Sequence, residues 1–242
     1  MPRRPDPSAD ARAPARAQAR PYHHGALRES LLATAEAWLD ARGTETLTLR
    51  ELAKAAGVSH AAPYHHFAGR DELLAGVAER AFVRLGDALA AAAAAAPDAR
   101  AALLDIGEAY VRVALAHPAR FRLMFGPTLA GKEAHAGLKT AADRAFGVLL
   151  AAARAHSPDG GVELALAGWS LAHGVANLAI DGALSGLPLP PEDARAIAQL
   201  EATTLVRRMA AGLLGDAAGA AGAAGAAPGA GAPAAPARSR RR

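Results

Sequence analysis

The sequence TLRELAKAAGVSHAAPYHHFAGRDELL, residues 48–74, contains two short helical segments separated by a tight turn. Thr48 can cap the first segment, and Glu51 three residues later completes the pattern of a capping box. Gly57 follows the last turn of that segment, where the left-handed conformation that ends a helix favours glycine. A second helix is expected over residues 60–67. This arrangement predicts a helix-turn-helix unit, whose second helix lies in the DNA major groove.

Polar and aromatic side chains crowd the second helix of this unit, for which Ser59 is the expected cap. Tyr64, His65 and His66 are consecutive, so their rings point in different directions and some must face solvent or a partner. A hydroxyl or a ring nitrogen can reach a phosphate or a base edge. No acidic residue lies between positions 57 and 70, so this surface is locally free of negative charge. The residues predicted to contact DNA are Thr48, Ser59, His60, Ala61, Tyr64, His65, His66 and Arg70.

Arg70 has a different predicted role from the other members of this set. It lies in the first turn of a third helix, which is expected to begin near Gly69. A guanidinium group and the free backbone N–H groups at the start of a helix are both suited to hold a phosphate. We therefore expect Arg70 to contact the DNA backbone.

Residues 47–74 resemble the tetracycline-repressor (TetR) family of bacterial transcriptional regulators. The pattern is LTLRELAKAAGVSHAAPYHHFAGRDELL, and one departure is Ala62-Pro63, where many members have Thr-Leu or Ser-Leu. The resemblance implies an all-α fold with an N-terminal three-helix helix-turn-helix domain and a C-terminal helical domain for ligand binding and dimerisation. It also implies a homodimer that binds a double-stranded DNA operator.

The C-terminal half carries a second resemblance. The motif Trp169-x-x-x-His173-Gly174, and His117-Pro118 followed by residues 121–125, resemble the C-terminal domain of one TetR subgroup. In this family the last two long helices of each subunit form a four-helix bundle across the two-fold axis. The resemblance therefore implies a homodimer interface formed by the expected helices at 162–184 and 192–214.

Apolar periodicity and breaks at Gly and Pro predict helices along the rest of the chain. Their expected ranges are 26–42, 69–96, 98–116, 119–125, 138–155, 162–184 and 192–214. The expected domains are a disordered basic arm (1–21), a helix-turn-helix DNA-binding domain (22–80), a ligand-binding and dimerisation domain (81–214) and a disordered Ala/Gly/Pro tail with an Arg-rich end (215–242).

Large rings and a methionine are concentrated in a few segments of the C-terminal half, where they can line a pocket or form ordinary core. Trp169, His173 and Asn177 share one face of a helix. The two polar side chains need partners there, which can be a ligand, the other subunit or a local backbone carbonyl. The residues predicted to bind a small, hydrophobic effector are Tyr110, Phe121, Met124, Phe125, Phe146, Trp169, His173 and Asn177.

Composition limits the remaining possibilities. The chain has 242 residues and no cysteine, so a disulfide framework and a thiolate metal site are excluded. The net charge is +4, but residues 1–24 and 238–242 carry +3 and +4, so the part between them is mildly acidic. No apolar signal segment or membrane span is evident, and we expect a cytoplasmic protein without a cofactor or bound metal.

The sequence favours a ligand-responsive DNA-binding regulator, most simply a repressor, that is not an enzyme. One alternative is an architectural DNA-binding protein that uses its basic ends. Another is a histidine-dependent hydrolase of small molecules. The hydrolase is disfavoured because the chain has no Gly-x-Ser-x-Gly elbow, no His-Glu-x-x-His helix and no glycine-rich phosphate loop.

Overall fold

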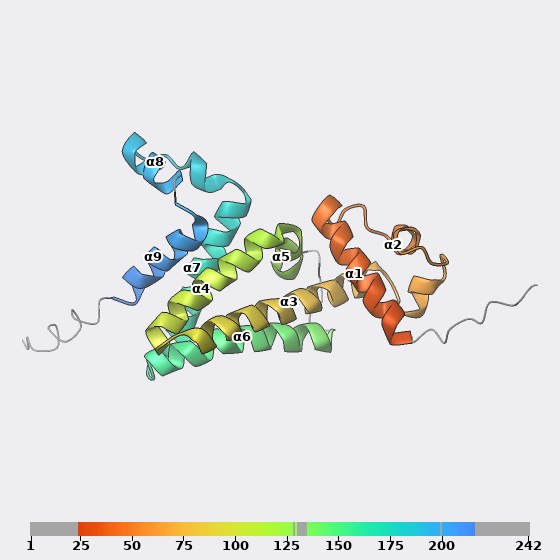
Figure 1. Cartoon of the computed structure of the whole chain (residues 1–242), viewed down its shortest axis with the longest axis horizontal. Helices are drawn as coiled ribbons and strands as arrows, with labels where there is room; N and C mark the ends of the chain where they lie inside the picture. The colour runs from red at the N-terminus through yellow and green to blue at the C-terminus, as the bar shows by residue number, and fades with distance from the viewer. Residues whose placement is uncertain (1–23, 128, 130–134, 199, 216–242) are drawn as a thin grey trace, which may run out of the picture.

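The computed structural model describes residues 24–127, 129, 135–198 and 200–215, and every regular element among them is a helix (Figure 1). The prediction of an all-α fold is confirmed. The arm predicted at 1–21, and all but the first residue of the predicted tail, lie outside the described residues. In the described part of the chain, no helix is long and apolar enough to cross a membrane.

Three elements form the N-terminal end of the molecule: α1 (His24–Arg42) and the shorter α2 (Leu49–Ala55) and 3₁₀-helix η1 (Ala62–His65). Glycines in the left-handed region end the first two, with φ of +72° at Gly43 and +67° at Gly57. A side chain at either position would be strained, because L-residues other than glycine rarely adopt this conformation. Both glycine stops lie where the sequence predicts them.

The second helix of the unit is shorter than the predicted range of 60–67 and differs in type. Pro63 has no N–H group, so the α-helical hydrogen bond to the carbonyl of Ser59 cannot form. Instead the N–H of Ala62 donates to the carbonyl oxygen of Ser59 at 3.0 Å, which is the tighter 3₁₀ spacing. Ala61 occupies the cap position and the helix has no side-chain cap, so the predicted capping by Ser59 is wrong.

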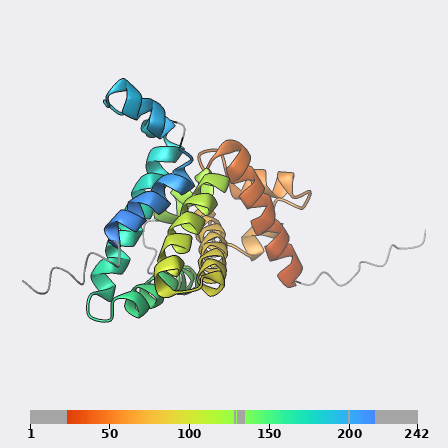
Figure 2. The same cartoon turned by 60° about the vertical axis from the view of Figure 1, so that its left-hand side comes forward.

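Two long helices lie side by side and carry the chain away from this end: α3 (Arg70–Ala95) and α6 (Ala136–His156) (Figures 1 and 2). They approach closely at Gly86, where an added Cβ would stand 3.5 Å from the Cα of Ala145. Helix α3 is continuous through residue 80, so the expected domain boundary falls inside one helix. The division into domains stays a prediction.

The body is completed by α4 (Ala99–Ala116), α5 (Pro118–Phe125) and α7 (Gly161–Ile180). The carboxylate of Asp98 accepts the N–H of Ala101 at 2.7 Å and so caps α4. His117 is not helical, and the following proline starts α5. The predicted break between these two helices is confirmed.

The C-terminal helices differ from the predicted ranges 162–184 and 192–214. Helix α7 stops at Ile180 and is followed by the 3₁₀-helix η3 (Ala183–Gly186), while the last predicted helix is divided into α8 (Pro191–Ala198) and α9 (Ala202–Leu213). Helix α9 packs on α4 and α7, whereas α8 packs on η3 and projects from the body (Figures 1 and 2). Helices α8 and α9 pack against different elements, so they do not form one continuous helix.

Candidate DNA-binding surface and ligand cavity

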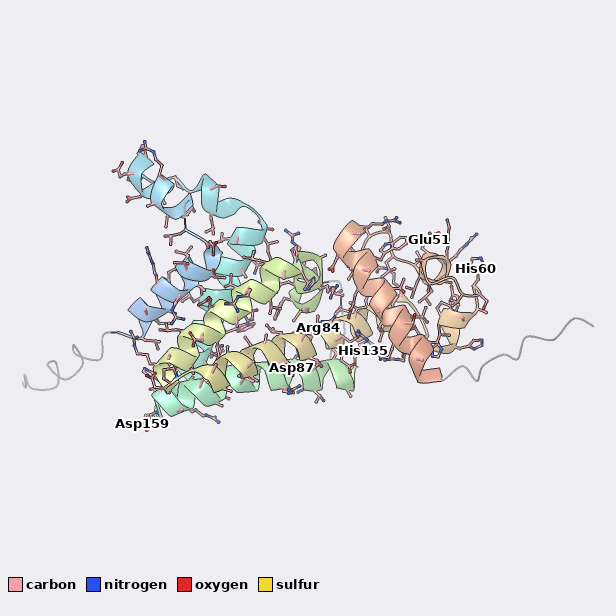
Figure 3. The ribbon with its side chains drawn as sticks, viewed as in Figure 1. Glu51, His60, Arg84, Asp87, His135 and Asp159 are labelled. Carbon is pink, nitrogen blue, oxygen red and sulfur yellow. The ribbon has the colours of Figure 1, made fainter. Side chains whose placement is uncertain are left out.

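The predicted recognition side chains lie on the outside of η1. Tyr64 is 59% exposed, His65 is exposed and His66 is partly exposed, whereas Pro63 and Phe67 are buried beneath them. The 3₁₀ turn thus anchors itself through one face and presents the rings on the other. Figure 3 shows the neighbouring His60 at one end of the molecule, opposite Asp159.

The other predicted DNA contacts precede η1 in the chain. Thr48 accepts the N–H of Glu51 through its hydroxyl oxygen at 3.1 Å, so it caps α2 as predicted. Thr48, Ser59, His60 and Ala61 are all exposed. Six of the eight predicted residues are therefore exposed and His66 is partly exposed, and their contacts with DNA stay a prediction.

Arg70, the eighth, is partly buried and bound to backbone carbonyl groups of the protein. Its Nε donates to the carbonyl oxygen of Leu47 at 2.9 Å, and one terminal nitrogen donates to that of Thr44 at 2.7 Å. Asp71 and Glu72 follow it in the first turn of α3, where their charges oppose a phosphate. Arg70 thus fixes the loop between α1 and α2, and a phosphate contact by this residue stays untested.

Sequence analysis missed two exposed cations on α2. Arg50 and Lys54 are one helical turn apart on the face opposite the buried Leu49, Leu52 and Ala53. Their spacing is a signal that the sequence already contained. Because phosphate neutralisation by Lys and Arg provides much of the affinity for DNA, both are candidates for backbone contacts.

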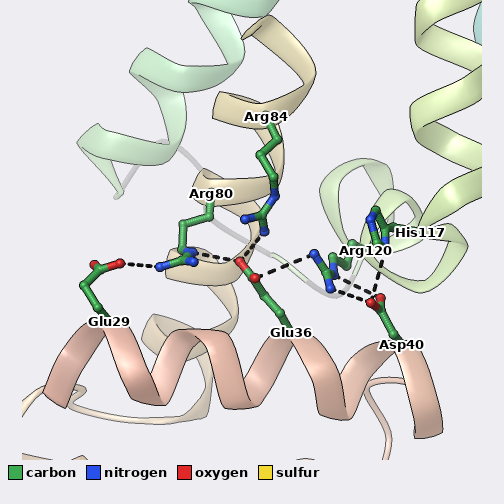
Figure 4. A network of polar contacts seen from close by, with 7 residues as sticks. All are labelled: Glu29, Glu36, Asp40, Arg80, Arg84, His117 and Arg120. Carbon is green, nitrogen blue, oxygen red and sulfur yellow. Dashed lines mark hydrogen bonds and ion pairs between the residues drawn. The ribbon is translucent and has the colours of Figure 1, made fainter. Parts of the chain in front are cut away.

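Ion pairs join α1 to the rest of the molecule. This α1 network consists of Glu29, Glu36, Asp40, Arg80, Arg84, His117 and Arg120 (Figure 4). At its centre Glu36 is only 6% exposed and accepts the Nε–H of Arg80 at 2.8 Å. Arg84 donates to the same carboxylate, and Arg120 of α5 lies 3.6 Å from it.

Helix α5 contacts α1 through the charged side chain of Arg120. The Nε of Arg120 donates to Asp40 at 2.9 Å, and a terminal nitrogen donates to the other carboxylate oxygen, which makes the pair bidentate. His117, just before α5, lies 3.2 Å from the same carboxylate. The side chain of Arg120 is only 12% exposed, whereas that of Asp40 is 31% exposed, so the arginine side of this contact is the buried one.

The opposite side of α5 borders an apolar cavity of about 450 Å³. Five of the eight predicted effector-binding residues line it, namely Tyr110, Met124, Phe125, Phe146 and Trp169. The wall is completed by apolar residues of α3, α4, α6, α7 and α9 that the prediction did not include, among them Phe82, Leu85, Leu103, Ile106, Leu149 and Val206. Periodicity had identified several of these as inward-facing, but it cannot distinguish a residue beside a void from one in a filled core.

The other three predicted residues line a different hollow. Phe121, His173 and Asn177, together with Phe125, border a space of about 470 Å³ against residues 43–45 at the end of α1. The predicted set is therefore divided between two sides of one aromatic wall. Phe125 belongs to both.

That wall is held by edge-to-face and tilted ring contacts. The ring centroid of Phe121 lies 5.7 Å from that of Tyr110 and 5.0 Å from that of Phe125, and Phe125 lies 4.7 Å from His173. Such pairs add a modest stabilisation beyond the area they bury. Phe146 is more isolated, with a ring contact to Trp169 at 6.2 Å.

Polar groups meet at one point of the wall. The Tyr110 hydroxyl lies 2.9 Å from Nδ1 of His173 and accepts the Trp169 Nε1–H at 3.4 Å. Burial raises the pKa of Tyr110, which the Trp169 hydrogen bond partly offsets, and burial lowers the pKa of His173. Asn177 donates to the backbone carbonyl of His173 at 2.8 Å, so of the three possible partners the local carbonyl is observed.

No group of three or more His, Cys, Asp or Glu side chains with the arrangement of a metal site occurs among the described residues. The arrangement contains an exposed aromatic and histidine surface at one end, an apolar cavity at the other, and helix α5, which borders the cavity and contacts α1.

Comparisons with known proteins assign both parts of the chain. The family described as "Bacterial regulatory proteins, tetR family" matches residues 31–77, and that described as "Tetracyclin repressor-like, C-terminal domain" matches residues 103–205. The comparison with curated proteins gives no significant match. The subgroup suggested by the motif at 169–174 stays a prediction.

Solved structures with the same fold include a Rhodococcus sp. RHA1 protein of unknown function, with 36% identity, coverage of 79% of this chain and 98% of that one, and a TM-score of 0.63. The TetR family transcriptional regulator PfmR from Thermus thermophilus has 26% identity, coverage of 76% and 96%, and a TM-score of 0.50. The fatty acid degradation regulator FadR from Bacillus halodurans, at 15% identity, covers 78% and 94% with a TM-score of 0.58, which shows a shared fold alone.

Proposed function

Because the chain belongs to the TetR family of DNA-binding transcription regulators, we propose that it is a repressor released from DNA by a small apolar effector. It binds a palindromic operator as a homodimer, with residues 22–80 forming the DNA-binding domain and residues 81–214 the effector and dimer domain. The effector binds better to a state in which the two recognition elements are wrongly spaced, and so shifts the population away from DNA. No catalytic step is part of this function.

The exposed side of η1 supports the DNA-binding role. Tyr64 and His65 project from a short element whose other face is anchored by buried Pro63 and Phe67. Because the backbone of this element is already fixed, binding to a DNA groove costs little additional conformational entropy. Exposed Arg50 and Lys54 lie on the adjoining helix, where they can hold phosphates. Base-edge and backbone contacts would thus come from neighbouring elements.

Exposed apolar side chains on α7 and α9 support the homodimer. They are Val162, Leu166, Leu178, Met209 and Leu213, each at least 41% exposed. Such a patch on two adjacent helices is typical of a protein–protein interface. A second copy of the chain would cover it, and α8 would then flank the interface.

The single observation that carries the effector mechanism is the position of α5. Its Met124 and Phe125 line the cavity, and its Arg120 holds Asp40 of α1. Helix α1 packs on α2 and α3, so a displacement of α5 by a ligand acts on the helix that orients the recognition element. Ligand binding and operator release are thereby coupled through eight residues.

The DNA-binding role is tested with the DNA upstream of the protein's own gene, by fluorescence anisotropy at fixed salt. The double change Tyr64→Ala and His65→Ala should weaken specific binding by about tenfold or more, since each base contact contributes about 1–3 kcal/mol. Val83→Ala, an exposed position on α3, is the control and should leave affinity unchanged. Unchanged affinity in the double variant would remove η1 from the interface.

The architectural alternative is distinguished by truncation. Removal of residues 1–21 and 216–242 should weaken binding and reduce its salt dependence, because the basic ends are lost, while sequence preference persists. An architectural protein that relies on these ends would instead lose binding altogether.

The coupling is tested with Arg120→Gln, which removes the charge that holds Asp40. The variant should still bind operator but should no longer be released by a ligand that releases the parent protein. Arg112→Gln is the matched control and should retain the response, because the ion pair that Arg112 makes within the described residues is with Glu108 of its own helix. Normal release in the Arg120 variant would argue against coupling through α5.

A further inference from the structure

We propose that the ligand of the apolar cavity is an uncharged molecule whose single polar group lies against the Tyr110 hydroxyl. This inference rests on the proposed effector role and sharpens it, since that role specifies only a small apolar molecule. Free carboxylates and phosphates are excluded from the class.

The described wall of the cavity offers no positive charge to a ligand. Among the described residues, no lysine, arginine or histidine belongs to the lining, and Asp143 is its one charged side chain. Asp143 is exposed and pairs with Lys139 of the same helix, so its charge is already balanced outside the cavity. An anion that entered would lose its water without gaining an opposite charge, which is strongly unfavourable.

Two cations next to lining residues are already paired elsewhere. Arg144 donates to Asp87 of α3 at 2.7 Å, and Arg207 of α9 pairs with both Asp105 and Glu108 of α4. The hydrogen bond from Arg207 to Asp105 also raises the pKa of the guanidinium, which keeps it charged and paired. A ligand anion could recruit either arginine only by breaking an existing ion pair.

The point where Tyr110, His173 and Trp169 meet, called the polar corner below, also favours an uncharged ligand. Tyr110, His173 and Trp169 are linked by hydrogen bonds, and burial disfavours both the tyrosinate and the imidazolium, so the corner is neutral near pH 7. At 3.4 Å the bond from Trp169 to the hydroxyl is long for a hydrogen bond. A ligand group can therefore replace it with a better one.

The two tautomers of His173 favour a ligand hydroxyl in particular. If Tyr110 donates to Nδ1, its oxygen is free to accept from the ligand; if Nδ1–H donates to Tyr110, the tyrosine proton is free for the ligand. A hydroxyl can act in either sense, whereas a carbonyl can act in only one. The cavity volume of about 450 Å³ suits a compact molecule of moderate size.

The test uses the full chain with Trp38→Phe, which leaves Trp169 of the cavity as the only tryptophan and hence the fluorescent reporter. The probes share a ten-carbon chain and differ in head group: decan-1-ol, sodium decanoate and decylammonium chloride. Saturable change of Trp169 emission is expected with decan-1-ol, and binding of both ionic probes should be about tenfold weaker or more.

A variant then tests the polar contact. Tyr110→Phe should weaken decan-1-ol binding about threefold to tenfold, the effect expected for the loss of one net hydrogen bond. The matched control is Thr140→Val, which removes a hydroxyl of α6 that bonds its own helix and lies outside the cavity. The control should bind like the parent, and the head-group series stands without either variant.

The outcomes separate this inference from the proposed function. Decanoate binding as tight as decan-1-ol binding, or no change of Trp169 emission with any probe, would overturn the ligand class. If decan-1-ol binds in the expected order but leaves the operator complex intact, the ligand class stands and the effector role of the cavity fails.

Discussion

The helix-turn-helix end and the cavity end of the molecule use their side chains in opposite ways. At the first, Arg70 satisfies two loop carbonyls and Glu36 is surrounded by arginines. At the second, aromatic rings meet edge-on and leave a space of about 450 Å³ between helices. Directional polar bonds fix a geometry, whereas apolar contacts around a void tolerate rearrangement.

This difference suits the two proposed tasks. A surface that reads DNA must hold its side chains in register, and a cavity that receives a ligand must adapt its shape. Helix α5 makes both kinds of contact, because Arg120 forms polar bonds in the α1 network and Phe121 makes apolar ring contacts in the aromatic wall. The following changes test whether the two ends differ in the way described, and they run from the largest expected effect to the smallest.

Phe121→Ala should have the largest effect on stability. The residue is 3% exposed and its ring contacts those of Tyr110, Phe125 and His173, so its removal should cost about 3–5 kcal/mol. Phe146→Ala, at a half-buried ring that faces the void, should cost about half as much. Urea unfolding measures both, and equal losses would mean that the cavity is packed as tightly as the wall.

Glu36→Ala tests the polar end. It leaves Arg120 largely buried with one carboxylate partner fewer, and we expect a loss of about 3 kcal/mol. Glu29→Ala is the matched control in the same network and helix, with a side chain that is 62% exposed, and should cost less than about 1 kcal/mol. Similar values for the two variants in chemical denaturation would contradict a central role for Glu36.

Gly57→Ala tests the turn of the helix-turn-helix. Its φ of +67° is unfavourable for alanine, and the expected cost is about 1–2 kcal/mol. Gly147→Ala, in the middle of α6 with open space around its Cβ position, should instead stabilise by about 0.5–1 kcal/mol. Opposite shifts of the thermal midpoint are expected, and a shared sign would show that the turn backbone is not what constrains position 57.

The smallest effect concerns pH. Burial lowers the pKa of His173 below its ordinary value of 6.5 in the folded state, so the unfolded chain binds a proton first as the pH falls. The contribution of neutral His173 to the free energy of unfolding is therefore complete above pH 6.5. It is lost progressively as the pH falls from 6.5 toward the lowered pKa of the folded state. His173→Gln should flatten this part of the stability curve, and an unchanged slope would show that the imidazole is not desolvated.

Sequence reasoning succeeded where the signal is local. The cap at Thr48, the stops at Gly43 and Gly57 and the break at His117-Pro118 each depend on the backbone conformation of a few adjacent residues. Tyr64 and His65 were correctly expected to be accessible, because consecutive rings on one turn cannot all be buried.

Sequence reasoning was less successful where packing between distant segments determines the surroundings of a side chain. Local reasoning did not foresee that the guanidinium of Arg70 would bind carbonyl groups of a loop more than twenty residues earlier, and its predicted DNA contact stays a prediction. The eight predicted effector residues were treated as one group, although Tyr110 and Asn177 lie on different sides of an aromatic wall. A helix over residues 60–67 was expected, but Pro63 removes a hydrogen bond that the α-helical form of so short an element needs, and a 3₁₀ turn forms instead.

The sequence by itself determined the helical class, the helix-turn-helix and the surface of polar rings, because caps, glycines, prolines and periodicity act over one or two turns. Only the tertiary structure decided which apolar residues enclose a void, where α8 separates from α9, and that α5 joins the cavity to α1. These features depend on how side chains from separate helices fill space and pair charges, which no short stretch of sequence specifies.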